Sequence, residues 1–376
     1  MKDSEQIFAN DLITKIDNEY FKATEYYLCN NKFINIIVNQ STENFDFSFK
    51  KIIEYLIDNN YEILSQFLFG NSYFEKENRD LAKKYFQSLS WPVTVIKQNG
   101  NTWGTLIKAI NTDRLETIYQ NSIVIGKHFK DEYADYILLE GLENNPKNIS
   151  KEESVKSIFQ CIESELKKIE MDFKNVVRTW FYLNDIVSWY DKFNTLRSNY
   201  FEGAGIFNNM IPASTGIGAT SNNNSNLLSL IFAVNPKNNN VKISPVISPL
   251  QCPAVYYKSA FSRAVEINHP KYKQLIISGT ASINPDGQSA HIEDIYGQIK
   301  LTMEVVNQIL VSKNMNWENV TKGFVYFKDI NDIKTFYYFC SNNKIPLMPL
   351  VMLQAGICRD ELLFEIEMDA IELNNN

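Results

Sequence analysis

Hydrophobic and polar positions follow two different periods along the C-terminal two thirds of the chain. In 155–171 and 295–315 apolar residues recur at three- and four-residue spacing, which indicates amphipathic helices. In 173–186 and 317–330 apolar and polar residues tend to alternate, which predicts β-strands. Each half of this region therefore predicts the order strand, long helix, strand, shorter helix, strand.

The two halves also resemble each other in sequence. The segments FKNVVRTWFYLNDI and WENVTKGFVYFKDI align so that Asn175 matches Asn319, an offset of 319 − 175 = 144 residues. The flanking segments correspond as well, 136–142 with 275–281 upstream and 189–201 with 333–343 downstream. The chain is thus predicted to contain two copies of one α/β unit, each a mixed sheet with two helices on one face.

The remaining segments give a weaker pattern. Strand-like runs at 33–38 and 91–96, with a helical run at 48–57 between them, predict an N-terminal α/β region that we interpret as a divergent third copy. Three prolines (Pro245, Pro249 and Pro253) predict an extended linker. The predicted division is 1–128 for the divergent α/β region, 129–240 for the first repeat, 241–270 for the linker and 271–376 for the second repeat.

The charge balance argues against a nucleic-acid partner. The 376 residues are 44% hydrophobic and carry a net charge of −7, and no block of five basic residues occurs. Phosphate contacts need an electropositive stripe, which this composition does not offer. The sequence therefore predicts a globular protein with a substantial core and no nucleic-acid partner.

Neither targeting nor metal-binding patterns stand out. The stretch 1–12 lacks the apolar core of a signal peptide, and no run approaches the roughly 18 apolar residues of a membrane span. The five cysteines show no CxxC spacing, and the three histidines lie far apart. We therefore expect a cytoplasmic protein with reduced cysteines, no membrane association, no metal site and no cofactor.

Several motifs of the second copy occur in the order typical of a known family. They are SGTASINPDG (278–287), Gln298, ENVTKGFVYFKDI (318–330) and FEIEMDAIE (364–372). The repeat thereby resembles the Rid family, formerly called YjgF or L-PSP proteins. The resemblance implies an α/β fold of the α+β type with tandem Rid/YjgF-like (chorismate-mutase-like) domains, in a family that forms trimers with ligand sites between subunits. A monomer or a homo-oligomer such as a trimer is expected.

Two tandem copies behind an N-terminal extension look more specifically like the chorismatases. The segments that carry this resemblance are RTWFYLNDI (178–186), FNTLRSNYF (193–201), PASTGIG (212–218), the 256–264 stretch, SGTASI (278–283) and CRDELLFEIE (358–367). The resemblance implies a cofactor-independent enzyme of secondary metabolism that releases pyruvate from chorismate.

Two departures from these families bear on the substrate. Rid deaminases hold a carboxylate with an arginine directly after a Pro-Ala pair, whereas this chain has PAS at 212–214 and PLMP at 346–349. Chorismatases usually carry Gly-His after SGTASI, where this chain has NPDG at 284–287. The expected substrate is therefore chorismate or a related enolpyruvyl compound. A Rid-type enamine or imine deaminase and a non-catalytic protein that binds a small anion are the alternatives.

The acidic last strand offers the candidate catalytic groups. Because side chains alternate in a strand, Glu365 and Glu367 share one face of 363–368 while the apolar positions between them share the other. A carboxylic acid desolvated by its neighbours has a raised pKa and can act as a general acid near neutral pH. We predict Glu365 as the acid with Glu367 as the alternate, and solvated strand residues as the competing interpretation.

An enolpyruvyl substrate of this kind carries two carboxylates, which the planar fork of arginine binds bidentately. Arg263 and Arg359 are the candidates, and Glu365 is expected to lie with them at the junction of the two copies. The predicted substrate-binding residues are Tyr256, Arg263, Gly279, Thr280, Ala281 and Arg359, the tyrosine because of the chorismatase resemblance.

Other reactive side chains have structural interpretations. Arg359 is followed by Asp360 and Glu361, so a simple ion pair in a turn is the alternative there. Arg178 is expected to pair with a carboxylate rather than a ligand. His291 is expected in a surface loop and Cys358 as a buried, unreactive thiol.

Overall fold

A computed structural model describes residues 13–28, 31–41, 45–98, 103–112, 114–144 and 149–374. The N-terminal stretch 1–12 and Cys29 lie outside the described residues. No helix among the described residues is long and apolar enough to cross a membrane.

The described chain forms three mixed sheets of six strands each, and each sheet with its two α-helices is called a unit here. The N-terminal unit comprises β1 (Ile13–Asp17), β2 (Lys22–Leu28), β3 (Asn31–Ser41), α1 (Phe45–Asp58), β4 (Glu62–Gly70), α2 (Ser72–Phe86), β5 (Val93–Lys97) and β6 (Trp103–Asn111). The middle unit comprises β7 (Leu115–Gln120), β8 (Ile123–Lys130), β9 (Ala134–Glu143), α3 (Lys151–Lys167), β10 (Val176–Leu183), α4 (Tyr190–Gly203), β11 (Ala213–Ile217) and β12 (Leu227–Pro236). The C-terminal unit comprises β13 (Lys242–Val246), β14 (Ala264–Asn268), β15 (Tyr272–Ala281), α5 (Ile295–Val311), β16 (Val320–Phe327), α6 (Ile333–Asn342), β17 (Leu350–Gln354) and β18 (Phe364–Leu373).

All three units share one topology. The sheet orders are β1-β2-β3-β6-β4-β5, β7-β8-β9-β12-β10-β11 and β13-β14-β15-β18-β16-β17, so the sixth strand of each unit lies between its third and fourth. In each unit the fourth and fifth strands pair in parallel, across the crossover made by the second helix of the unit. The predicted fold class, a repeated α+β unit with a mixed sheet, is confirmed.

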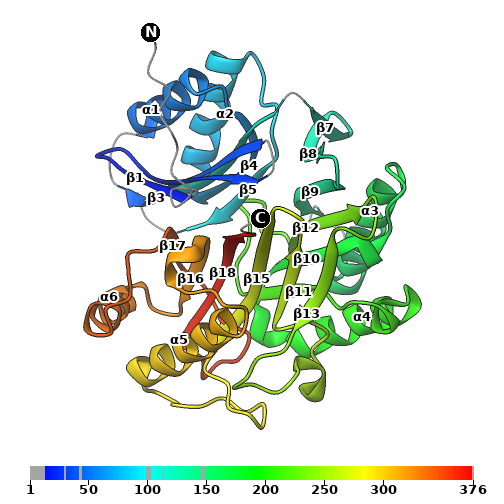
Figure 1. Cartoon of the computed structure of the whole chain (residues 1–376), viewed down its shortest axis with the longest axis vertical. Helices are drawn as coiled ribbons and strands as arrows, with labels where there is room; N and C mark the ends of the chain where they lie inside the picture. Colours follow the sequence, from blue (N-terminus) through cyan, green and yellow to red (C-terminus); the bar gives the residue numbers. More distant parts are fainter. Residues whose placement is uncertain are drawn as a thin grey trace.

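The helices of each unit pack on one face of its sheet, and the opposite faces of the three sheets meet at the centre of the molecule (Figure 1). Strand β16 illustrates the consequence, because all eight of its residues are buried. Val325 and Phe327 belong to the core under α5 and α6, whereas Phe324 and Tyr326 belong to a core shared by all three units. Side chains on both faces of these strands are therefore withdrawn from water.

The units are joined in a closed ring. The fifth strand of each unit contacts the third strand of the next, as the pairs β5 and β9, β11 and β15, and β17 and β3 show. At the last of these junctions the Asn39 side chain donates to Leu350 O at 2.7 Å and accepts from Met352 N at 3.0 Å. At β11 and β15, Ser214 N donates to Ser278 Oγ at 2.9 Å. Three equivalent junctions result, and one of them carries the candidate site.

The repeat seen in the sequence has a structural cause. Asn175 and Asn319 accept hydrogen bonds from Asp172 N at 3.0 Å and Asn316 N at 2.9 Å, closing equivalent capping turns directly before β10 and β16. A short polar side chain there satisfies the backbone of the turn. The offset of 144 residues thus marks the same turn in two units.

The predicted boundaries differ from the observed elements at two places. Strands β7 and β8, at 115–130, pair within the middle sheet, although most of this stretch falls in the predicted N-terminal region. The predicted linker 241–270 contains β13 and β14 of the C-terminal sheet. Pro245 lies in β13, which pairs only with β14, and an edge strand is where a sheet tolerates a residue without an N–H.

Candidate active site at the junction of the middle and C-terminal units

Strand β18 presents its two glutamates to the centre of the molecule. Phe364, Ile366 and Met368 pack in the core under α5 and α6, so the intervening Glu365 and Glu367 lie on the opposite face, as predicted. Both glutamates are buried, at 4% and 2% exposure respectively. The interpretation of these two residues as solvated is wrong.

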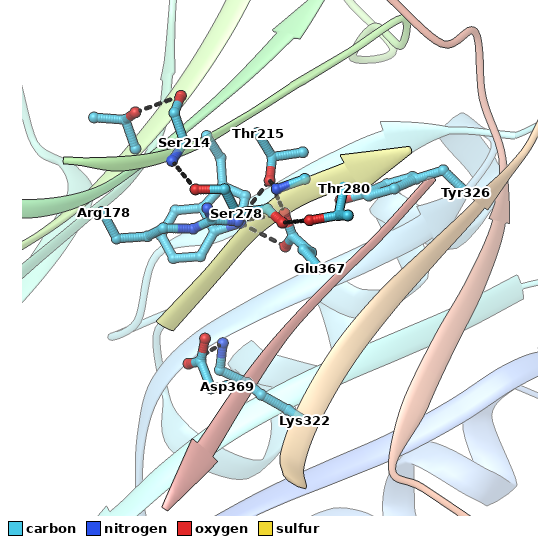
Figure 2. A network of polar contacts seen from close by, with 12 residues as sticks. Arg178, Ser214, Thr215, Ser278, Thr280, Lys322, Tyr326, Glu367 and Asp369 are labelled. Carbon is cyan, nitrogen blue, oxygen red and sulfur yellow. Dashed lines mark hydrogen bonds and ion pairs between the residues drawn. The ribbon is translucent and has the colours of Figure 1, made fainter. Parts of the chain in front are cut away.

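Glu367 is fully engaged by neighbouring side chains (Figure 2). It pairs with Arg178 at 2.5 Å and accepts from Trp180 Nε1 at 2.6 Å, and the Thr215 hydroxyl donates to it as well. These donors belong to β10 and β11 of the middle unit, so the network joins two units. Glu367 is thus a structural partner of the middle unit, and the expectation that Arg178 pairs with a carboxylate is confirmed.

Glu365 lines a cleft between α4 and β11 of the middle unit and β15 of the C-terminal unit. Three arginines line the same cleft, and we call it the arginine cleft. Its principal residues are Tyr190, Asn194, Arg197, Ser214, Tyr257, Ser259, Arg263, Gly279, Ala281, Cys358, Arg359 and Glu365. The structure thus brings Arg263, Arg359 and Glu365 together at the junction where they were expected.

Arg197 is the most deeply buried cation of the cleft, with 1% exposure. Its guanidinium donates to Asn194 Oδ1 at 2.7 Å and to Ser214 Oγ at 3.4 Å, while its Nε has no partner among the described residues. Burial lowers the pKa of this arginine, and no carboxylate of the described chain lies within ion-pair distance. A desolvated cation without a counter-ion is costly to the fold and well suited to bind an anion.

The other two arginines share an aromatic support. The Arg263 and Arg359 guanidiniums lie 5.4 and 5.3 Å from the centre of the Tyr257 ring. Arg263 donates twice to Cys252 O, at 3.1 and 2.9 Å, and Arg359 donates to Ser289 Oγ at 3.2 Å. Neither pairs with a carboxylate among the described residues, so the interpretation of Arg359 as an ion pair of the turn is wrong. The cleft therefore presents three uncompensated positive charges.

Burial raises the pKa of Glu365 to about 8, and the ionised Glu367 beside it adds to this effect, while Arg178 and Arg263 oppose it. No described side chain or backbone N–H donates a hydrogen bond to its carboxyl group, in contrast to Glu367. Glu365 is therefore predominantly protonated at neutral pH and available to donate a proton.

Gly279 makes room for this acid. A Cβ at position 279 would overlap Glu365 Oε1, so the backbone of β15 passes directly beside the carboxyl group. The Gly279 N–H donates to Thr215 Oγ1 at 2.9 Å, which ties β15 to β11. The glycine is required here by close approach of the backbone to a functional side chain.

The other two junctions of the ring lack this chemistry. Leu228 occupies the position of Glu365 in the middle unit, since it pairs with Tyr182 as Glu365 pairs with Tyr326. The cleft beside it is lined by carboxylates and amides, including Glu75 and Glu143. Gly104 is the equivalent residue of the N-terminal unit, where aromatic and aliphatic side chains leave only a small space. That cleft also contains Arg79, but this arginine pairs with Glu75 at 2.9 Å. Glu365 and the arginines without a carboxylate partner therefore occur together at one junction of the described ring.

The structure places some predicted residues elsewhere. Tyr256 is 78% exposed and does not line the cleft, where the adjacent Tyr257 is found instead. Thr280 is buried on the opposite face of β15 from Ala281, and its hydroxyl donates to Ser278 O at 2.9 Å. His291 is exposed, as expected. Burial raises the pKa of Cys358 to about 12, which keeps its thiol protonated. The described residues contain no cluster of ligands suited to a metal ion.

Arg197 was not predicted, although the sequence contains a signal for it. It falls between Phe193 and Phe201 at four-residue spacing in α4, and both phenylalanines are fully buried. An arginine within the apolar stripe of a helix must be buried and therefore needs an anion. The spacing of Arg197 from Phe193 and Phe201 could therefore have identified it as a candidate anion-binding residue.

Comparison with known proteins agrees with this geometry. Residues 254–372 match the family model described as Endoribonuclease L-PSP. The chain is 25% identical over 231 residues to a chorismatase of Streptomyces hygroscopicus and 24% identical over 225 residues to a 3-hydroxybenzoate synthase of the same organism. These alignments cover 56% and 53% of this chain and 64% of each relative.

A crystal structure of chorismatase matches 82% of this chain and 92% of its own, with a TM-score of 0.60 at 18% identity. The chain thus has a chorismatase-like fold, and its C-terminal unit, which contains Glu365, matches the L-PSP family model. The chain spans just under two thirds of the length of the curated relatives it matches.

Proposed function

We propose that this protein releases pyruvate from chorismate, or from a closely related enolpyruvyl ether, by acid-catalysed hydrolysis in the arginine cleft. The observation that carries the proposal is a buried, protonated Glu365 in one cleft with three arginines that have no carboxylate partner in the described chain. The similarity to chorismatases supports the same substrate class.

The arginines match the charge of such a substrate. Chorismate carries one carboxylate on its ring and one on its enolpyruvyl side chain, and arginine forks bind carboxylates in a fixed orientation. Arg197 lies on α4 of the middle unit, whereas Arg263 and Arg359 come from the C-terminal unit and lie over the Tyr257 ring. Donors from two units can therefore orient two carboxylates and direct the enol ether toward Glu365.

The chemical step follows from the protonated state of Glu365. Its carboxyl proton is transferred to the terminal methylene carbon of the enol ether, whose π electrons form the new C–H bond and leave an oxocarbenium ion. Water adds to the ether-bearing carbon of this oxocarbenium ion, and the resulting hemiketal collapses to pyruvate and the ring alcohol. The proton that the water gives up returns to the Glu365 carboxylate, so the net reaction consumes one water. General acid catalysis of this kind typically contributes 10²–10⁴-fold to the rate.

The test is to incubate purified protein with chorismate and to follow pyruvate with a coupled lactate dehydrogenase assay. The Glu365→Gln variant keeps the shape of the side chain but cannot supply the proton, so kcat is expected to fall by about 10²–10⁴-fold. Glu304→Gln, at an exposed position of α5, is the matched control and is expected to keep wild-type activity.

Calorimetric titration of Glu365→Gln with chorismate separates catalysis from binding. Retained binding without turnover supports the proposed role of the acid. Binding by the wild type without any pyruvate release would instead indicate a protein that only binds a small anion. If chorismate neither binds nor reacts, 2-aminoacrylate becomes the next substrate to assay, and the enolpyruvyl proposal is withdrawn.

A further inference from the structure

A second cavity of about 90 Å³ lies at the centre of the ring, between the inner faces of the three sheets. We call it the axial cavity; its principal residues are Phe33, Lys108, Phe129, Tyr136, Phe232 and Lys322. It is distinct from the arginine cleft, since the two have no lining residue in common. Its volume accommodates on the order of seven water-sized groups, which is close to the size of one substituted six-membered ring.

One wall of the axial cavity is a ladder of aromatic rings. Phe33 meets Phe129 edge-on at 6.0 Å between ring centres, Phe129 stacks on Tyr136 at 4.9 Å, and Tyr136 stacks on Phe232 at 6.3 Å. The ladder runs from β3 of the N-terminal unit across β8, β9 and β12 of the middle unit. Such a wall favours a flat apolar ligand, because rings pack on one another with offset or edge-on geometry.

Three cations, one from each unit, gather at the polar end of the cavity around the Trp180 ring. Lys108, Arg178 and Lys322 lie 5.5, 4.6 and 5.6 Å from its centre. Two of them are compensated, since Arg178 pairs with Glu367 at 2.5 Å and Lys322 pairs with Asp369 at 2.6 Å (Figure 2).

Lys108 has a weaker ionic partner than the other two cations. It forms an ion pair with Glu140, but the distance of 3.7 Å from Nζ to Oε1 is about 1 Å longer than in the pairs of Arg178 and Lys322. Its side chain keeps 12% exposure at the centre of the molecule, where the space it faces is the axial cavity. A buried ammonium with free donors and a neighbouring cavity is a receptor for an anionic group.

The charges around Lys108 are consistent with this role. Burial and the nearby Lys322 lower its pKa to about 8, while Glu140, Asp369 and Glu367 oppose the shift. Burial also raises the pKa of Glu140, which weakens the negative charge that Lys108 faces. Lys108 is mainly protonated at pH 7 and lacks a strong internal counter-ion.

We infer that the axial cavity binds a small aromatic monocarboxylate, with its ring against the Phe129, Tyr136 and Phe232 ladder and its carboxylate between Lys108 and Lys322. The ring supplies apolar contact area, and the carboxylate gives Lys108 a close counter-ion in a dry environment, beside the Lys322 ammonium group. The site does not depend on the proposed hydrolysis, since none of its residues takes part in that reaction.

The test uses benzoate as the probe and isothermal titration calorimetry as the readout. The triple variant Arg197→Met/Arg263→Met/Arg359→Met removes the arginines of the arginine cleft and is expected to bind one benzoate per chain. Adding Lys108→Met, which keeps the length of the side chain without its charge, is expected to weaken binding at least tenfold. Lys300→Met, at an exposed position of α5, is the matched control and should change nothing.

The same titration has outcomes that overturn the inference. Benzoate binding that survives Lys108→Met, or that disappears in Arg197→Met/Arg263→Met/Arg359→Met, would assign the ligand to another site. Binding is also expected to weaken as the pH rises above about 8, where Lys108 loses its proton. A pH-independent affinity would contradict the role of Lys108.

A measurement on the wild-type protein tests the axial cavity even if a variant does not fold. Wild-type crystals soaked in 4-iodobenzoate should show an anomalous iodine peak between the three sheets, beside Phe129 and Phe232. A peak in the arginine cleft alone, or no peak inside the ring, would refute the axial site.

Discussion

Glu365 and Glu367 are the same type of residue on the same face of β18, yet their surroundings differ. Glu367 receives hydrogen bonds from Arg178, Trp180 and Thr215. Glu365 receives no hydrogen bond from the described residues, and burial raises its pKa to about 8. A buried carboxyl group with a raised pKa keeps its proton near neutral pH and can act as a general acid.

Removing the charge of Arg178 and of Arg197, the two most buried arginines, is expected to change the free energy of unfolding in opposite directions. Arg197→Met removes a desolvated cation without a carboxylate partner, so we expect the free energy of unfolding to rise by about 1 kcal/mol. Arg178→Met leaves Glu367 charged and unpaired in the interior, so a loss of about 3–5 kcal/mol is expected. Urea denaturation of both variants measures the difference.

The Arg197 variant also has a functional readout. If Arg197 binds a substrate carboxylate, Arg197→Met should raise the KM for chorismate at least tenfold, because it removes a charge-assisted contact. A variant that is strongly destabilised and binds chorismate normally would make Arg197 a structural residue.

For single residues, the sequence predicts which kinds of side chain form the site better than it predicts which neighbouring residue lines the cleft. Strand alternation was sufficient to place Glu365 and Glu367 on one face, because a strand has a fixed period. Tyr256 was predicted from the chorismatase resemblance, whereas Tyr257 lines the cleft. Both lie in the short 3-10 helix 254–257, where no two-residue period distinguishes them. The partner of Glu367 comes from a strand 189 residues away and has no local signature.

At the scale of elements, the site depends on how closely β15 passes β18 and β11. Gly279→Ala would push a methyl group into Glu365 Oε1, so the acid must move. We expect kcat to fall about 10²-fold and stability to fall by about 1–3 kcal/mol, as overpacking of a core does. Pyruvate release and urea denaturation measure the two effects.

Gly203→Ala is the matched control for that substitution. Gly203 ends α4, and a Cβ there meets no atom within 4 Å. The change should leave activity intact and stabilise the helix by about 0.5–1 kcal/mol. Equal losses of activity and stability in both variants would mean that the space beside Glu365 at position 279 has no special importance.

The predicted elements are most accurate where the period is strong. The long helices at 155–171 and 295–315 correspond to α3 and α5, with their ends shifted by a few residues. The hairpin of β7 and β8 was not separated from the N-terminal region because β7 has no fully buried residue and hence little alternation. Strand β13 was predicted as linker because of its proline, which an edge strand accommodates.

At the scale of the whole molecule, the ring is stabilised by cores that every unit shares. Phe67, Trp180 and Phe324 come from three different units and belong to one buried cluster. We expect the chain to unfold in a single calorimetric transition, since no unit can separate without exposing that cluster. Two resolved transitions would indicate units that are stable alone.

A substitution of Asn39 tests whether the junction of β3 and β17, which is separate from the arginine cleft, stabilises the ring. Its side chain makes both hydrogen bonds that join β3 to the backbone of β17, so Asn39→Ala should lower the free energy of unfolding by about 1–2 kcal/mol. Pyruvate release is expected to stay at the wild-type rate. Lost activity with unchanged stability would argue against three separate junctions.

The arrangement of the ring could be predicted only in part. The two C-terminal copies share enough residues to be aligned, whereas the N-terminal unit shares the strand order without a recognisable motif. Strand order follows from long-range pairing, which a local pattern does not encode. The Rid resemblance implied ligand sites between subunits, and the structure has the corresponding junctions within one chain.

The most direct test of the central claim is the dependence of kcat/KM for pyruvate release from chorismate on pH. The profile reports the protonation state of the free protein, in which Glu365 must carry its proton to react. With its pKa raised to about 8 by burial, activity should hold below that pH and fall about tenfold per unit above it. Activity that is unchanged through pH 10, or no pyruvate release at any pH, would contradict the account.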